Sequence, residues 1–109
     1  MNCNVLTIPQ FEKDVKKLAK KFKAIKKDLF NLISELQEEP TQGTSLGNGL
    51  YKLRLANSSI PRGKSGGFRV ITYFIDDENN LYLLSIYSKT EKENISDEEL
   101  KEALKFFDA

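Results

Sequence analysis

The chain has 109 residues, of which 39% are hydrophobic and 30% charged, values typical of one globular domain (residues 1–109) with a modest core. Its formal net charge is only +1, and the absence of histidine excludes imidazole catalysis and histidine-ligated metal sites. The single cysteine, Cys3, allows neither an internal disulfide nor a zinc cluster. No apolar run exceeds four residues, so we expect a cytoplasmic protein without a signal peptide, membrane span, metal or cofactor.

The first forty residues predict a short strand followed by a helical hairpin. Residues 1–8 carry a short apolar alternation at Cys3, Val5 and Ile8 that predicts an edge strand, and Pro9 suits the first turn of a helix. Apolar residues then recur at spacings of three and four in two successive stripes, with a break at residues 22–24. Pro40 ends the second helix, and residues 41–49 are expected to form a polar connector.

The first helix and the following corner are strongly basic. Such a run is typical of the solvated face of an amphipathic helix, but it can also attract a polyanion electrostatically. Both interpretations stay open. The lysines concerned are Lys13, Lys16, Lys17, Lys20, Lys21, Lys23, Lys26 and Lys27.

The stretch from residue 50 to residue 92 predicts three strands. Residues 50–55 alternate apolar and basic side chains with a period of two, which indicates one buried and one charged face. Residues 68–75 and 81–87 are rich in β-branched and aromatic residues, and the acidic turn between them predicts a hairpin. Asn79 or Asn80 can supply the positive φ that such a turn needs.

The C-terminal segment predicts a capped helix. Ser96 and Glu99 fit a capping box, and Ile95 and Leu100 are spaced to form a hydrophobic staple. The order strand, two helices, three strands, helix predicts an α+β fold. In it, an N-terminal helical hairpin packs on a small antiparallel sheet of about four strands, with a helix at the C-terminus.

A local excess of basic residues marks the first two of the three central strands and the loop between them. Five basic residues and no acidic one lie from Lys52 to Arg69, although the chain as a whole is nearly neutral. Three glycines near the middle of this stretch leave backbone N–H groups that could approach an anion closely. The simpler interpretation is a flexible, solubilising surface loop. The five basic residues are Lys52, Arg54, Arg62, Lys64 and Arg69.

Together these motifs resemble the RelE/ParE toxin superfamily, and most closely its HigB branch. The similarity covers about residues 50–100, whereas the helical start fits the layout of the family without a sharp motif. The matching segments are Lys52-Leu53-Arg54, the run GKSGGFRVITYF from Gly63 to Phe74, and the run LSIYSKTEKE from Leu84 to Glu93.

The resemblance implies a RelE-like, microbial-ribonuclease type of fold and a bacterial type II toxin that cuts messenger RNA on the ribosome. It further implies a cognate antitoxin, in the HigB branch a HigA-like helix-turn-helix repressor, through which the pair binds operator DNA. No membrane partner is implied. An antitoxin is also expected on physical grounds, because so basic a site must be masked to be tolerated.

The residues are compatible with metal-independent RNA cleavage. RNA supplies its own nucleophile, the 2′-hydroxyl, so the protein must move protons and stabilise negative charge at phosphorus. Arginine binds phosphate oxygens with a permanently charged planar fork, and lysine can act as an acid, or as a base if its pKa is lowered.

The resemblance implies the following roles. Arg69 matches the arginine that contacts the scissile phosphate, Lys52 and Arg54 match a basic pair on the preceding strand, and Lys89 belongs to the basic end of the last strand. Residues 89–96 lack the arginine and tyrosine that some relatives carry, so Tyr87 is the substitute candidate for stacking on a base.

Three further basic residues are candidates for RNA or phosphate binding. They are Arg62, Lys64 and Lys92, of which Lys92 could equally form local ion pairs within its Glu-Lys-Glu run. Two other function classes are open: a ParE-like, non-catalytic inhibitor of DNA gyrase or topoisomerase on the same fold, and an RNA-binding module without activity. The clustered basic residues argue against the inhibitor, which needs no phosphate-binding centre.

Overall fold

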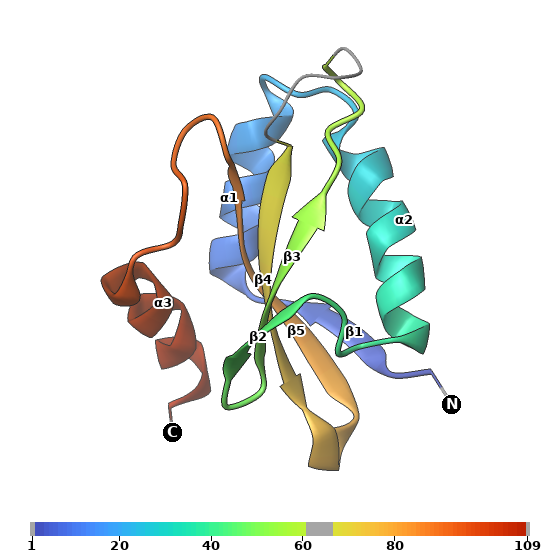
Figure 1. Ribbon diagram of the computed structural model, residues 1–109, viewed down its shortest axis with the longest axis vertical. Coiled ribbons are helices and arrows are strands. Elements are labelled where there is room, and N and C mark those ends of the chain that lie inside the picture. Colours follow the sequence, from blue (N-terminus) through green and yellow to red (C-terminus); the bar gives the residue numbers. More distant parts are fainter. Residues whose placement is uncertain (1, 61–66, 109) are drawn as a thin grey trace.

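The computed structural model describes residues 2–60 and 67–108 (Figure 1). Within these ranges a five-stranded sheet has the strand order β1-β5-β4-β3-β2. The elements are β1 (Asn4–Thr7), α1 (Pro9–Ala19), α2 (Ile25–Glu38), β2 (Thr44–Gly47), β3 (Leu50–Leu55), β4 (Phe68–Ile75), β5 (Asn80–Ser88) and α3 (Asp97–Leu104), with short 3₁₀ turns at Asp76–Glu78 and Lys105–Phe107.

The structure confirms the α+β class, the helical hairpin and the C-terminal helix. The corner of the hairpin lies between Ala19 and Ile25, and Pro9 stands in the first turn of α1. The capping box of α3 is formed: the Glu99 backbone N–H donates to Ser96 Oγ, and the Ser96 N–H donates to Glu99 Oε1, both at 3.1 Å. Asn79 adopts the left-handed conformation, with φ of 55°.

The sheet corrects the sequence prediction in two respects. It has five strands, because β2 lies in the segment expected to be a connector, and it is mixed, because β1 runs parallel to β5. All four residues of β2 are exposed, and the pairing with β3 is irregular between Ser45 and Gly47. A strand that is exposed on both faces has no need of alternating hydrophobicity, so its sequence carries no period-two signal.

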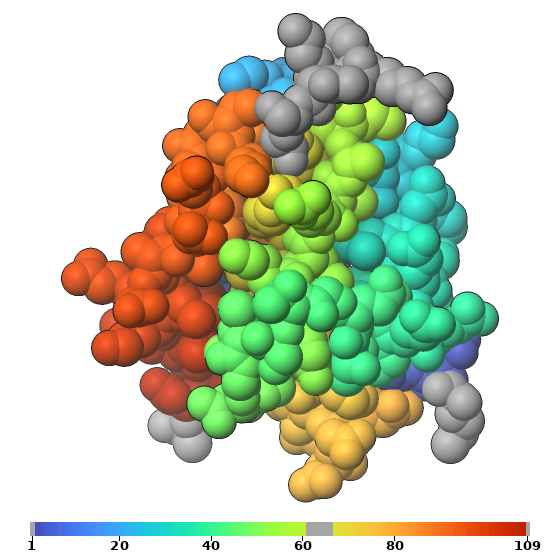
Figure 2. All heavy atoms as spheres, in the orientation of Figure 1, coloured from blue at the N-terminus to red at the C-terminus, as the bar shows by residue number. Residues whose placement is uncertain are grey.

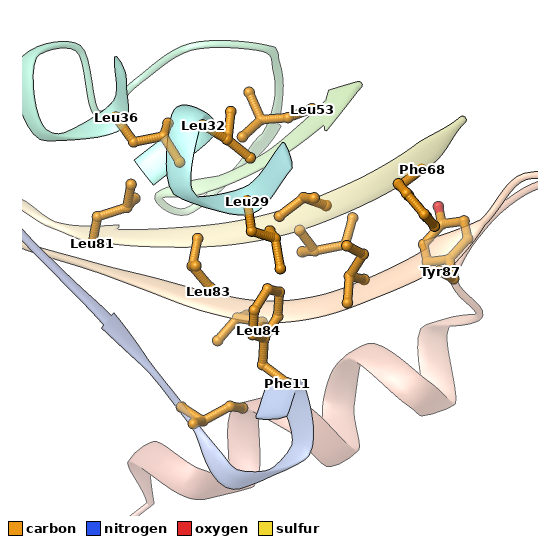
Figure 3. Close-up of a cluster of buried hydrophobic side chains, with 14 of the residues drawn as sticks. Phe11, Leu29, Leu32, Leu36, Leu53, Phe68, Leu81, Leu83, Leu84 and Tyr87 are labelled. Atoms are coloured by element: carbon orange, nitrogen blue, oxygen red, sulfur yellow. The ribbon is translucent and has the colours of Figure 1, made fainter. Parts of the chain in front are cut away.

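The hydrophobic core lies between one face of the sheet and the helices α1 and α2 (Figure 3). In Figure 1 α1 passes behind β4 and α2 lies to the right of β3, whereas α3 lies on the left. Leucines of α2 and Phe11 of α1 meet inward side chains of β3, β4 and β5, and Phe22 packs edge-to-face on Phe68 with ring centroids 5.3 Å apart. The buried hydrophobic residues labelled in Figure 3 are Phe11, Leu29, Leu32, Leu36, Leu53, Phe68, Leu81, Leu83 and Leu84, together with Tyr87, which pairs with Arg69 of β4.

The segment containing α3 packs on the opposite face of the sheet, which also carries polar side chains. The ring of Phe107, just after α3, packs edge-to-face on Tyr73 and Tyr82, with centroids 5.0 and 4.8 Å away. The lysines of α1 and of the corner are all exposed, so both interpretations of that basic run stay open. Part of this second sheet face is not covered by α3, and the basic side chains of β3 and β4 lie there.

Candidate functional site

Four basic side chains line one cavity of about 340 Å³ on the sheet face opposite to α1 and α2. In Figure 2 a hollow over β4 (yellow) lies between β3 (lime green) and the segment that follows β5 (orange). The lining residues are Thr44, Lys52, Leu53, Arg54, Arg69, Lys89, Glu93 and Asn94.

Strand register explains why these residues meet. Lys52 pairs with Ile71, and Arg54 pairs with Arg69, which in turn pairs with Tyr87 across the sheet. Directly paired residues project from the same face of a sheet, so Lys52, Arg54 and Arg69 share one face. The core face is built from the alternate positions, including Leu53 and Phe68. The alternation of basic and apolar residues thus puts the charges opposite to the core.

The cationic groups differ in exposure. Only 7% of Arg69 is exposed, and its Nη1 donates to the Phe68 carbonyl oxygen at 3.2 Å. Lys52 is half-buried and its Nζ donates to Asn94 Oδ1 at 3.1 Å. Arg54 and Lys89 are exposed. The site therefore has a fixed, shielded guanidinium at its base and more accessible charges around it.

Gly67 fixes the backbone at the edge of this cavity. Its carbonyl accepts from the Lys89 N–H at 3.0 Å, which joins the start of β4 to the end of β5. Its φ is +64°, and a Cβ at this position would stand 2.8 Å from the Leu55 carbonyl oxygen. Only glycine fits both the conformation and the close approach.

Tyr87 is not brought into the basic cavity. Only 5% of it is exposed, and its hydroxyl accepts from the Ile95 N–H at 3.2 Å. Lys92 lies over the Tyr87 ring, 5.0 Å from the centroid, and forms an ion pair with Glu99. The contacts of Tyr87 hold the segment after β5 against the sheet. Its stacking on RNA stays a prediction.

The other residues predicted to bind RNA or phosphate are Lys92, Arg62 and Lys64. Lys92 lines two neighbouring cavities rather than the basic one, and its RNA contact stays a prediction. Arg62 and Lys64 lie outside the described residues.

Thr44, Glu93 and Asn94 are site residues that sequence reasoning missed. Thr44 belongs to the strand that has no alternation to reveal it. Glu93 and Asn94 lie in an irregular segment whose path depends on tertiary contacts. Only Glu93 has a signal that could have found it, a carboxylate close to a basic strand end.

A second cavity of about 300 Å³ lies between α1, β5 and α3. Asp14 on its wall is half-buried, and this burial raises the pKa of its carboxyl, although hydrogen bonds from Gln10 and from the Ile86 backbone act in the opposite direction. By contrast, hydrogen bonds from Lys92 and from the Ser96 backbone lower the pKa of Glu99.

The chemistry available in the basic cavity is that of anion binding. Two guanidinium and two ammonium groups converge on one face, and they can bind phosphate oxygens and neutralise charge that develops on them. Among the described residues, no group of three or more acidic, cysteine or histidine side chains could hold a metal ion.

Comparison with known proteins identifies the family. The family model described as RelE toxin of the RelE/RelB toxin-antitoxin system matches residues 11–108. The chain belongs to the RelE toxin family. No helix in residues 2–60 or 67–108 is long and apolar enough to cross a membrane.

Solved structures show the RelE fold. A mutant of E. coli toxin RelE in the free state is 19% identical, with a TM-score of 0.65, over 97% of this chain and 98% of that one. The isolated E. coli RelE toxin gives a TM-score of 0.59 at 19% identity, over 96% and 98%. The RelBE2 toxin-antitoxin complex of Mycobacterium tuberculosis gives 0.54 at 15% identity, over 81% of this chain and 99% of that one.

Proposed function

We propose that this RelE-family toxin is a ribosome-dependent endoribonuclease that cuts messenger RNA and so inhibits translation. The observation that carries the proposal is the convergence of Lys52, Arg54, Arg69 and Lys89 on one cavity outside the core. A buried arginine next to accessible cations suits an anionic transition state, because its charge needs no reorganisation when the substrate arrives.

The proposed reaction is attack of the RNA 2′-hydroxyl on the adjacent phosphate. Arg69, held by strand pairing and by its bond to the Phe68 carbonyl, binds a phosphate oxygen, and Arg54 opposite it binds another. Lys52 or Lys89 protonates the leaving 5′-oxygen. The products are a 2′,3′-cyclic phosphate and a 5′-hydroxyl end. No metal or cofactor takes part.

The ribosome supplies what the cavity lacks. The site has fixed charges but, among its described lining residues, no aromatic ring to hold a base. A messenger held in the decoding site is already unpaired and oriented, and orientation of the reacting groups removes a large part of a barrier. The toxin therefore acts poorly on free RNA and well on ribosome-bound RNA.

The cellular setting is part of the same proposal. We place the chain in the HigB-like branch, as one toxin domain spanning residues 1–109, in the cytoplasm where ribosomes and messenger RNA are found. Its cognate antitoxin is HigA-like, with a helix-turn-helix that binds operator DNA, and it masks the basic cavity. A toxin-antitoxin complex among the similar solved structures supports a cognate protein partner.

The competing function is ParE-like inhibition of a topoisomerase on the same fold. Such an inhibitor acts by binding a protein surface and needs no phosphate-binding centre. The four converging cations therefore favour the nuclease.

The proposal is tested by toeprinting of a defined messenger on programmed ribosomes with purified wild type, Arg69→Ala and Arg54→Ala. Loss of one phosphate-binding arginine is expected to slow cleavage by about 10²–10³-fold. Arg54 is exposed, so its variant should fold even if replacement of the buried Arg69 disturbs the sheet. Lys105→Ala is the control, because Lys105 is exposed at the end of α3, where it pairs with Glu102 away from the cavity.

The outcomes separate the functions. Cleavage by wild type and Lys105→Ala alone supports the nuclease and its centre. Equal cleavage by all four proteins would keep the function and remove both arginines from the centre. No cleavage by wild type, together with loss of gyrase activity in a purified assay, would establish the inhibitor instead.

A further inference from the structure

The basic cavity contains one carboxylate. Among the eight described lining residues, Glu93 is the single acidic one, and it faces a site that otherwise holds Lys52, Arg54, Arg69 and Lys89. Glu93 is exposed, and its carboxylate has no hydrogen bond or ion pair within the described part of the chain. The carboxylate is therefore free to meet a ligand in the cavity.

The backbone around Glu93 is held in place on both sides. Before it, the N–H groups of Glu91 and Lys92 both donate to the Ser88 carbonyl, at 3.0 and 3.2 Å. After it, Asn94 Oδ1 accepts from Lys52 Nζ, and the Ile95 N–H donates to the Tyr87 hydroxyl. These contacts fix the segment after β5 beside the hollow seen in Figure 2. Glu93 is thus presented to the cavity by an anchored segment.

The proposed reaction needs an acceptor for the proton of the 2′-hydroxyl, and Glu93 is the carboxylate in the cavity that can provide one. Charged lysine and arginine are hydrogen-bond donors without a free lone pair, so in the form that binds phosphate they cannot take a proton. The hydroxyl of Thr44 and the amide of Asn94 are too weakly basic for the task. An ionised carboxylate is an acceptor only, and the chain has no histidine that could take this role.

We propose that Glu93 is the general base of the RNA cleavage reaction, an inference that rests on the proposed function. The Glu93 carboxylate takes the proton of the 2′-hydroxyl while the bond from O2′ to phosphorus forms. The bond from phosphorus to O5′ breaks, and the ammonium group of Lys52 or Lys89 gives O5′ a proton. Arg69 and Arg54 stabilise the charge on the phosphate oxygens in between. Solvent then returns the proton from Glu93 to the lysine.

The test is a single-turnover cleavage assay on programmed ribosomes with wild type, Glu93→Gln and Glu93→Asp. The amide keeps the shape of the carboxylate but cannot accept the proton, so Glu93→Gln is expected to slow cleavage by about 10²–10⁴-fold. Glu93→Asp keeps a carboxylate at a shorter reach and should retain partial activity. Ribosome binding by Glu93→Gln should be equal or tighter, because a negative charge near the phosphates is removed.

Glu91→Gln is the matched control. It makes the same change of charge two residues earlier, at an exposed position that lines a different cavity, and should cleave within about twofold of wild type, as do surface changes away from a site. Cleavage by Glu93→Gln at the wild-type rate, or faster, would overturn the assignment while leaving the nuclease intact. Failure of the wild type to cleave would instead overturn the nuclease, and the general base with it.

Discussion

At the scale of single residues, the arginines of the basic cavity are placed where they destabilise the fold. Arg54 and Arg69 stand directly opposite each other on β3 and β4, and like charges in directly paired positions weaken a sheet. Arg69 is moreover buried, where an arginine has to be compensated by hydrogen bonds such as the one to the Phe68 carbonyl. Such an arrangement is expected where ligand binding, rather than folding, determines the side chains.

The Asp14 side chain leads to a prediction about stability and pH. Burial raises the pKa of its carboxyl, so the folded chain holds the proton more tightly than the unfolded chain does. As the pH rises from the usual aspartate pKa through the raised one, the folded state loses stability because the charged form is disfavoured. Asp14→Asn removes this loss, so at pH 7 the variant should be more stable than wild type.

The measurement is urea unfolding of both proteins at pH 3 and pH 7. The stability difference between variant and wild type should be larger at pH 7 than at pH 3, where Asp14 is mostly protonated in both states. Asp77→Asn, in the exposed turn between β4 and β5, is the control for a change of charge without burial. A difference between Asp14→Asn and wild type that shrinks as the pH rises would contradict the raised pKa.

Among the elements of the fold, the segment between β5 and α3 organises the site. It carries Glu93 and Asn94 into the cavity, and it is anchored at one end by β5 and at the other by the capping box of α3. Phe107 holds the far end of α3 on Tyr73 and Tyr82. The position of the site residues on this segment therefore depends on the docking of α3.

The capping box leads to a prediction about the stability of α3. Ser96→Ala removes the acceptor for the Glu99 N–H and should lower the free energy of unfolding by about 1 kcal/mol, the usual cost of losing a side-chain N-cap. Urea denaturation measures the loss. Ser34→Ala is the control, because the Ser34 hydroxyl only donates to the Phe30 carbonyl within α2, and alanine is the better helix former there. Equal stabilities for the two variants would show that the cap contributes nothing.

The same elements show what a sequence can predict. Local signals are sufficient for the Ser96 cap, the positive φ of Asn79 and the helical corner, because these depend on neighbouring residues alone. Long-range arrangements are harder to predict. The parallel pairing of β1 with β5 joins Asn4 to Asn80 across most of the chain, and the exposed β2 has no periodic pattern.

In the candidate site, too, some residues could be predicted from local sequence and others could not. Alternation along β3 is enough to put Lys52 and Arg54 on one face, since a strand has only two faces, but that Arg69 shares this face follows only from the register of β4 with β3. The burial of Tyr87 could not be predicted from its strand position, because it depends on the segment that folds back over its ring. Glu93 lies on that same irregular segment, where no periodic pattern assigns a side chain to a face.

In the molecule as a whole, the two faces of the sheet differ in what they contact. One face, packed on α1 and α2, supplies the core, and the other presents the cations of the basic cavity next to α3. This division lets charge accumulate on one side without exposing the core to it.

If the basic cavity cleaves RNA on the ribosome, the 2′-hydroxyl beside the cleaved bond is indispensable. This requirement is measured with two messengers on programmed ribosomes, identical except for one 2′-deoxynucleotide on the 5′ side of that bond, and by analysis of the product ends. We expect cleavage of the all-ribose messenger alone, with a 2′,3′-cyclic phosphate and a 5′-hydroxyl as the new ends. Equal cleavage of both messengers, or a new 5′-phosphate end, would rule out attack by the 2′-hydroxyl.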